Sequence, residues 1–237
     1  MKKIYLSFFA LAFLISAYSQ QTETIRDANA QERKATGFHA IQIEDGIDLY
    51  LSEGKEESLA ISASKEFQPK VISVVENGVL RIYFDGDRLI GWRNRNLKAY
   101  VSFKQLDKIS ASGGADVIVK GSISSKTLTM KLSGGSDFIG KVTVEDLDIH
   151  QSGGSDVRIS GTAGNVKINA SGGSDFKGYD LSSAITDLQA SGGSDAEITV
   201  SKELSIEASG GSDVHYKGDA VIKRSSSSGG SGVSKRG

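Results

Sequence analysis

The sequence is poor in two residues that constrain loops: cysteine is absent and proline occurs once. Without cysteine, the chain has no disulfide bond, no thiolate metal site, no cysteine nucleophile and no lipid-modified N-terminal cysteine. Glycine occurs 28 times in 237 residues, above its usual share of about 7%. This balance favours a regular structure with many tight turns over a disordered chain rich in both glycine and proline.

The sequence also lacks an excess of charge, with a formal net charge of -1 at pH 7. A near-neutral chain offers no strong field for nucleic acid or for an acidic membrane surface, so we expect no nucleic-acid partner. Its length suits one domain of ordinary size or two small ones.

Long apolar runs are confined to the first twenty residues, which have the pattern of an export signal. "MKK" supplies the positive start, "IYLSFFALAFLISA" supplies an apolar core too short for a typical span, and Ala17 and Ser19 supply small residues. We expect a signal peptide over 1–19, with an uncleaved anchor as the alternative, and a polar linker over 20–35. No transmembrane segment then remains, and the protein is expected in the periplasm, at the outer-membrane surface or outside the cell.

One phrase recurs through the second half of the chain: "ASGGADVIVKG", "LSGGSDFIGKV", "QSGGSDVRISG", "ASGGSDFKGYD", "ASGGSDAEITV" and "ASGGSDVHYKG". A degenerate seventh copy opens at Ser228, and successive copies are 18 to 21 residues apart. The opening serines of the six full copies are Ser112, Ser133, Ser152, Ser171, Ser191 and Ser209. A period near 19 residues indicates one small supersecondary unit stacked on its neighbours.

Apolar residues alternate with polar ones on both sides of each phrase, and helical spacing is not sustained between residues 105 and 220. Alternation of this kind indicates strands with one buried face. The apolar positions before the phrases are Leu128, Met130, Leu132, Leu147, Ile149, Val166, Ile168, Ala170, Leu204, Ile206 and Ala208. Those after the phrases are Val117, Phe138, Val157, Phe176, Ala196 and Val214. The repeat therefore predicts an all-β fold, a parallel β-solenoid with coils of about 19 residues.

The glycine pairs are expected at the corners of these coils, because glycine adopts positive φ without a Cβ clash. Serine and aspartate side chains bond nearby backbone groups at such turns, so a structural role explains every letter of the phrase. The predicted corner glycines are Gly113, Gly114, Gly134, Gly135, Gly153, Gly154, Gly172, Gly173, Gly192, Gly193, Gly210 and Gly211.

Stacking of the coils would place the aspartates of the phrases in one column: Asp116, Asp137, Asp156, Asp175, Asp195 and Asp213. Carboxylates about 5 Å apart would repel by on the order of 1 kcal/mol per pair in water. Calcium takes oxygen ligands and would relieve that repulsion. The phrase also resembles the glycine- and aspartate-rich nonapeptide of calcium-binding β-rolls. The alternatives are a calcium-binding column and an exposed column that bonds turn amides. The fold requires no cofactor, and calcium is the one candidate.

The sequence pattern is different in "GFHAIQIEDGIDLYLSEGKEESLAISAS", which begins at Gly37. This segment predicts a strand, a turn at "EDG" and a second strand. Its alternating apolar residues are Ile41, Ile43, Ile47, Leu49 and Leu51. "ENGVLRIYFDG" and "NLKAYVSF" predict further strands that continue into the first phrase. We therefore expect one all-β domain over 36–220 with irregular N-terminal coils.

These segments, in this order, resemble the family known as "putative auto-transporter adhesin, head GIN domain", whose members are exported bacterial proteins common in Bacteroidetes. The resemblance rests on the segment from Gly37, on "ENGVLRIYF", on "LDKISASGGADVIVKG" and on the phrases that follow. It covers about residues 36–220 and implies a right-handed parallel β-helix that is exported to the cell envelope. It carries over no catalytic or binding residues.

No catalytic constellation is evident in the sequence. His39, His150 and His215 are isolated, and the last two have outward-facing phase on their strands, so we interpret them as bystanders. Neither a zinc-binding spacing nor a nucleophile elbow before a helix occurs. We expect a non-enzymatic protein. A polysaccharide-active enzyme on a β-helix is the alternative, which fold alone does not support.

Residues 85–100, "DGDRLIGWRNRNLKAY", form the least repetitive segment and hold the only tryptophan. Trp92 lies beside Arg93, Arg95 and Tyr100, and such residues are common in binding hot spots. We therefore predict a ligand-binding loop here, with a loop that covers the end of the core as the alternative. Two arginines are too few to indicate nucleic acid.

Residues 221–237 keep a glycine pair but lose the apolar strand and the aspartate, so we expect a degenerate capping coil or a flexible tail. With the resemblance, the sequence predicts an envelope protein that is an adhesin or a glycan- or surface-binding module. A surface glycan or an envelope protein is the expected partner. A calcium-stabilised structural module is a further hypothesis, and the sequence leaves the ligand and the oligomeric state open.

Overall fold

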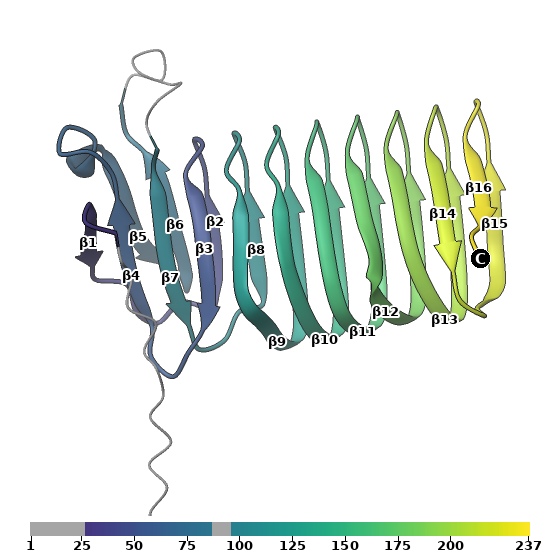
Figure 1. The fold of residues 1–237 in the computed structure, drawn as a ribbon, viewed down its shortest axis with the longest axis horizontal. Helices are drawn as coiled ribbons and strands as arrows, with labels where there is room; N and C mark the ends of the chain where they lie inside the picture. Colours follow the sequence, from purple (N-terminus) through teal and green to yellow (C-terminus); the bar gives the residue numbers. More distant parts are fainter. Residues whose placement is uncertain (1–26, 87–95) are drawn as a thin grey trace, which may run out of the picture.

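The structure, a computed structural model, describes residues 27–86 and 96–237 as a long stack of β coils (Figure 1). The predicted signal peptide lies outside the described residues. Within them, strands account for all regular structure except one short 3-10 helix, η1 (Gln68–Lys70). None of the described helical structure is long and apolar enough to cross a membrane.

Five long strands form the regular part of the stack, and each bends once to run along both faces of its coil (Figure 1). They are β9 (Val117–Leu132), β10 (Phe138–Gln151), β11 (Asp156–Ala170), β12 (Asp175–Ala190) and β13 (Asp195–Ala208). All four neighbouring pairs are parallel, and equivalent letters of successive repeats pair with one another. The predicted β-solenoid with coils of about 19 residues is thus confirmed.

Shorter strands build the N-terminal part. On one face β2 (Ala40–Ile43) lies between β6 (Val79–Phe84) and β8 (Lys108–Ala111), and on the other β3 (Asp48–Glu53) lies between β7 (Lys98–Phe103) and β9. These pairs are parallel, so the coils continue here with irregular connections, as predicted.

Three antiparallel strands extend this end of the stack. β5 (Val71–Glu76) pairs with β6, β4 (Ser58–Ser62) pairs with β7, and β1 (Ala30–Arg33) pairs with β4. The prediction of a linker over 20–35 missed β1, because "AQER" shows no apolar alternation. A strand can still form there, since its backbone bonds to β4 need no buried side chains.

The C-terminal residues form a further coil. After β14 (Asp213–Lys217), β15 (Val221–Ser227) pairs with β13 and β16 (Gly232–Lys235) pairs with β14. All seven side chains of β15 are exposed. This last coil thus keeps the parallel backbone pairing of the repeats, while β15 contributes little to the core.

The core consists of columns of inward side chains that run along the stack. One column passes through Met130, Ile149, Ile168, Leu188 and Ile206, and none of these side chains is more than 1% exposed. Every alternating apolar residue predicted from the repeat is buried. The two-residue period therefore identified the buried face correctly on both sides of each phrase.

Candidate functional site

The phrases form the corners of the coils, at the tips drawn along the upper edge of Figure 1. At the first glycine of the phrase the backbone has positive φ, for example 78° at Gly192. A Cβ there would lie 2.8 Å from the carbonyl oxygen of Gly172 in the preceding coil. At Gly193, a Cβ would meet nothing closer than 3.8 Å. In this coil the first glycine is therefore required by the stacking, and the second is not.

In every full phrase but the first, which has Ala115, a serine precedes the aspartate and lies inside the corner. Its hydroxyl donates to the carbonyl oxygen three residues earlier in three of the coils, as from Ser194 to Ser191 at 2.9 Å. The fully buried serines at this position are Ser136, Ser155, Ser174, Ser194 and Ser212. The hydroxyls of Ser136, Ser174, Ser194 and Ser212 bond turn backbone that would otherwise be buried without a partner.

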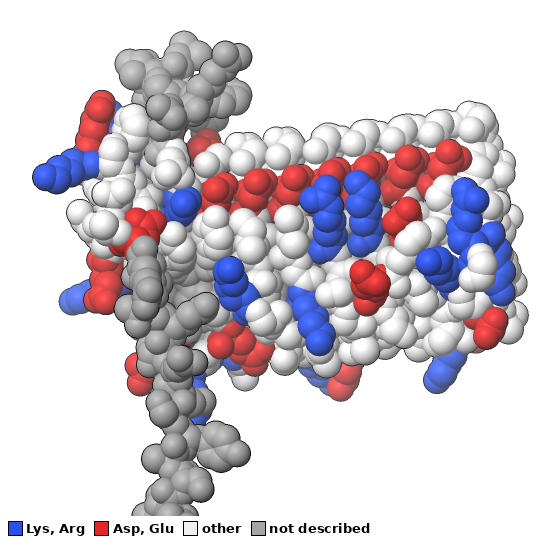
Figure 2. Space-filling view, viewed as in Figure 1, with Lys and Arg blue, Asp and Glu red and all other residues white. Residues whose placement is uncertain are grey.

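The six predicted aspartates lie in one column beside the corners, seen as a row of acidic side chains in Figure 2. Three carboxylates accept from the backbone N–H of the aspartate in the next coil: Asp116 from Asp137 at 3.3 Å, Asp137 from Asp156 at 3.0 Å and Asp195 from Asp213 at 2.9 Å. We call this row, together with Asp48, which is described below, the Asp column. These three side chains therefore bond the backbone of the neighbouring corner, whereas Asp175 pairs with Lys177 at 3.2 Å.

Asp48 extends the Asp column by one coil toward the N-terminus. Because Ile43 pairs beside Ala111 and Leu49 beside Val117, "EDGID" occupies the place of "SGGAD" in the next coil. Sequence reasoning missed this corner, which has no Ser-Gly-Gly. The detectable signal was the spacing from Gly46 to Asp48, which matches that from Gly114 to Asp116.

Burial raises the pKa of Asp48 and Asp116 above the usual range. For Asp48 the negative charge of Asp116 raises the pKa further, and Lys98 lowers it. For Asp116 the N–H of Asp137 lowers the pKa, and the charge of Asp137 raises it. The carboxylates lie in single file, and across the described residues no three His, Cys, Asp or Glu side chains converge on a metal position. The calcium-binding column stays a prediction.

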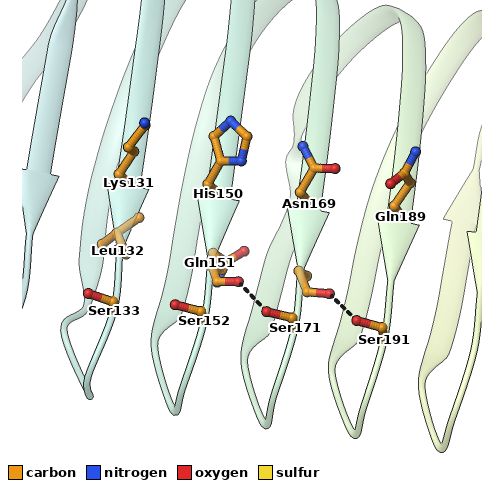
Figure 3. Close-up of a pocket in the computed structure, with 11 residues that line it drawn as sticks. Lys131, Leu132, Ser133, His150, Gln151, Ser152, Asn169, Ser171, Gln189 and Ser191 are labelled. Carbon is orange, nitrogen blue, oxygen red and sulfur yellow. Dashed lines mark hydrogen bonds between the residues drawn. The ribbon is translucent and has the colours of Figure 1, made fainter.

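A shallow cavity of about 470 Å³ lies on the face that precedes the corners (Figure 3). We call it the groove. Two outward columns of side chains line it along the solenoid axis, with the backbone of the inward residues between them. The first column is Lys131, His150, Asn169 and Gln189, and the second is Ser133, Ser152, Ser171 and Ser191.

Some groove side chains bond the protein itself. The hydroxyl of Ser171 donates to the carbonyl oxygen of Gln151 at 3.2 Å (Figure 3), and His150 Nε2 lies 3.2 Å from Asp148 Oδ2. Within the described part of the chain, the remaining polar groups make no hydrogen bond or ion pair through their side chains: Lys131, Ser133, Ser152, Asn169 and Gln189. These five side chains are available to a ligand.

Gln151 lies under the groove, at an inward position where the other five full phrases have alanine or leucine. It is 2% exposed, and its Nε2 donates to the carbonyl oxygens of Ser155 and Asp175 at 3.1 and 2.9 Å. Its Oε1 and the hydroxyl of Ser155 are buried without a partner in the described structure. Sequence reasoning did not single out Gln151, although it is the only polar residue before the six full phrases.

The other predicted site residues are not brought together. Trp92, Arg93 and Arg95 lie outside the described residues. Tyr100 lies on β7, where its ring stacks on Tyr50 at 5.2 Å and its hydroxyl donates to Asp27 at 2.9 Å. Burial and the bond to Asp27 raise the pKa of Tyr100 to about 12. Tyr100 therefore takes part in closing the N-terminal coils.

The histidines also stand apart from one another. His39 pairs with Asp107 at 2.9 Å, and His215 Nδ1 lies 2.8 Å from the hydroxyl of Ser234. His150, as predicted, faces outward, with its side chain 43% exposed. It is the one histidine that lines the groove.

A stack of parallel coils with repeated corners and a polar groove defines the class of the protein: it is a β-solenoid. Residues 37–220 match the model of the family described as "Putative auto-transporter adhesin, head GIN domain", and the chain belongs to that family. The resemblance seen in the sequence is thereby confirmed. Comparison with curated proteins finds no match.

Solved structures share the fold at low identity. A putative adhesin from Bacteroides fragilis superposes with a TM-score of 0.79 at 19% identity, covering 87% of this chain and 95% of that one. A putative adhesin from Parabacteroides merdae has a TM-score of 0.67 at 16% identity, covering 88% and 95%. A structure described as a putative lipid binding protein from Parabacteroides distasonis has a TM-score of 0.67 at 16% identity, covering 88% and 96%. None of these descriptions names an enzyme.

Proposed function

We propose that this protein is a non-enzymatic, exported envelope adhesin that binds a surface glycan along the groove. Membership of a family described as putative adhesins supports the adhesive role. The export-signal pattern of the first residues supports the location. The solenoid supplies a rigid support, since each regular coil is hydrogen-bonded along its length to both neighbours.

The observation that carries the proposal is the set of uncommitted polar side chains in the groove. Elsewhere on the same sheet, neighbouring outward side chains bond one another, as Asn165 does with Asp146 at 2.7 Å. In the groove, Lys131, Asn169 and Gln189 have no such partner within the described structure. Successive coils are about 4.8 Å apart, close to the repeat of an extended sugar chain. Hydroxyls of successive sugars can therefore meet side chains of successive coils.

A glycan suits this lining better than an acyl chain does. One structural relative is described as a putative lipid binding protein. Here, however, the side chains that face the groove end in ammonium, imidazole, amide and hydroxyl groups (Figure 3). An acyl chain would bury such groups without partners, at a cost of about 1–3 kcal/mol each.

A glycan array followed by titration calorimetry on the purified protein tests the proposal. Replacing Asn169 and Gln189 together by alanine is expected to weaken binding at least tenfold, or about 1.4 kcal/mol. Asn165→Ala, which changes an exposed amide outside the groove, is the matched control and should leave the affinity unchanged. Unchanged affinity in the double variant would contradict the groove as the binding site.

Analysis of the recovered ligand separates an adhesin from a polysaccharide-active enzyme. We expect the glycan to be recovered at its original length after prolonged incubation, measured by mass spectrometry. Shortened chains would contradict the non-enzymatic assignment, even if the groove variants had reduced binding.

A further inference from the structure

Charge is distributed unevenly along the groove. Its first outward column runs from Lys131 on β9 through His150 and Asn169 to Gln189 on β12 (Figure 3), and Glu207 on β13 continues it just beyond. One end therefore carries an ammonium group, the middle carries an imidazole and an amide, and the other end carries an amide followed by a carboxylate.

The positive charge at the Lys131 end is free. Its side chain is exposed and, within the described residues, no carboxylate lies within ion-pair distance of its ammonium group. At the far end Arg224 pairs with Glu207 at 2.9 Å and approaches Asp187 at 3.9 Å. Among the described residues that line the groove, Lys131 therefore supplies the one ammonium group, and it is unpaired.

His150 complements this end of the groove. In the tautomer that donates from Nε2 to Asp148, its Nδ1 is an acceptor for a sugar hydroxyl. Asn169 and Gln189 each offer an amide donor and a carbonyl acceptor, which suit neutral hydroxyl groups. Lys131 and Gln189 are three coils apart, or about 14 Å, so a short oligosaccharide spans both environments.

We infer that the groove selects a glycan that carries an anionic sugar, and that Lys131 fixes the anion at the β9 end. The inference rests on the proposed function and adds the class of glycan and its direction along the stack. The anionic group is a carboxylate or a sulfate ester, and both present oxygens that accept from an ammonium group. Neutral sugars of the same chain lie over Asn169 and Gln189.

The test compares a neutral xylo-oligosaccharide that carries a single uronic acid at one end with the same oligosaccharide after its carboxylate is reduced to an alcohol. The unsubstituted protein is expected to bind the anionic chain about tenfold more tightly at low salt. Lys131→Gln should remove that preference, so that the anionic chain and the reduced chain bind with equal affinity. Lys167→Gln, which removes an exposed charge from the neighbouring outward column of β11, is the matched control and should keep the preference. A sulfated oligosaccharide shows which anionic group is preferred.

The outcomes separate the inference from the proposed function. Equal affinity for the two chains, with binding retained, overturns the inference and leaves a glycan adhesin standing. Equal loss of preference in Lys131→Gln and Lys167→Gln also overturns it, because the attraction would then be diffuse. Failure of the protein to bind any member of the array contradicts both. Thermal melts of each variant show that the fold is intact.

Discussion

The corners and the groove lie on the same coils, a few residues apart, yet they follow opposite rules. At the corners the letters are nearly constant, and the side chains bond backbone of their own or the next coil, as Ser194 and Asp137 do. In the first outward column of the groove the residue changes from coil to coil, and Lys131, Asn169 and Gln189 bond nothing in the described structure. Between these two sets of positions, constancy goes with bonds that hold the coil together, and variation goes with side chains that have no partner in the described structure.

The largest expected effect on stability is at the corner glycines. Gly192→Ala is expected to lower the free energy of unfolding by about 2–3 kcal/mol, because alanine resists positive φ and its Cβ would press on the preceding coil. Gly193→Ala, one residue on, should be neutral or slightly stabilising. Chemical denaturation of the two variants measures the difference, and equal effects would contradict the assigned roles.

A buried corner hydroxyl is expected to matter less than a corner glycine. Ser194→Ala removes a donor to Ser191 and an acceptor for its N–H at 3.1 Å, and should cost about 1–2 kcal/mol. Ser191→Ala, which loses only a half-buried bond of 3.5 Å to Ala170, should cost less in the same denaturation experiment. The reverse order would show that the exposed serines hold the corner.

Asp48 offers a pH-dependent test with a smaller effect. Since its folded-state pKa is raised, protonation of Asp48 favours the folded state; this contribution is complete below the ordinary value of about 3.9 and is lost as pH rises through the folded pKa. At neutral pH the charge is therefore a cost, and Asp48→Asn should stabilise the protein by less than about 1 kcal/mol after solvent screening.

Thermal melts at neutral pH and near pH 3 measure this effect. The stabilisation by Asp48→Asn is expected at neutral pH and should vanish in acid. Asp219→Asn, whose carboxylate is fully exposed, is the control and should change little at either pH. A variant that is destabilised at neutral pH would indicate that the Asp48 carboxylate has a stabilising partner.

The smallest expected effect is that of calcium. Because three carboxylates of the Asp column accept from backbone N–H groups and Asp175 pairs with Lys177, we expect the same melting temperature in excess calcium and in chelator. A ligand at 100 times its dissociation constant would stabilise the fold by about 2.7 kcal/mol. A shift that Asp137→Asn abolishes would instead make the Asp column a calcium site.

The fold was predictable because its signals repeat. Alternation around six nearly identical phrases identified inward residues such as Met130 and Phe138, and both are fully buried. Where the repeat is disguised, prediction failed: "EDGID" forms a corner without the phrase, and β1 pairs through its backbone alone. The repeated coils of a solenoid are therefore easier to predict from local sequence than the irregular coils and strands at its end.

The groove could not be predicted from any single segment. Lys131, His150, Asn169 and Gln189 are about one coil apart in the sequence and share no residue type, so only the stacking brings them together. The sequence instead predicted a site at Trp92 and its neighbours, because the only tryptophan of the sequence lies there beside arginines. Of the four residues predicted there, the structure describes Tyr100, which contacts Tyr50 and Asp27.

The in-register pairing of the regular coils has a consequence for how such a protein changes over generations. A unit that contacts only its two neighbours can be duplicated or deleted whole without disturbing the rest. Loss of the coil that carries Asn169 would bring His150 beside Gln189, shorten the groove by one step and leave every other corner intact. The length of the groove is thus set by the number of coils, which gene duplication can change without a new fold.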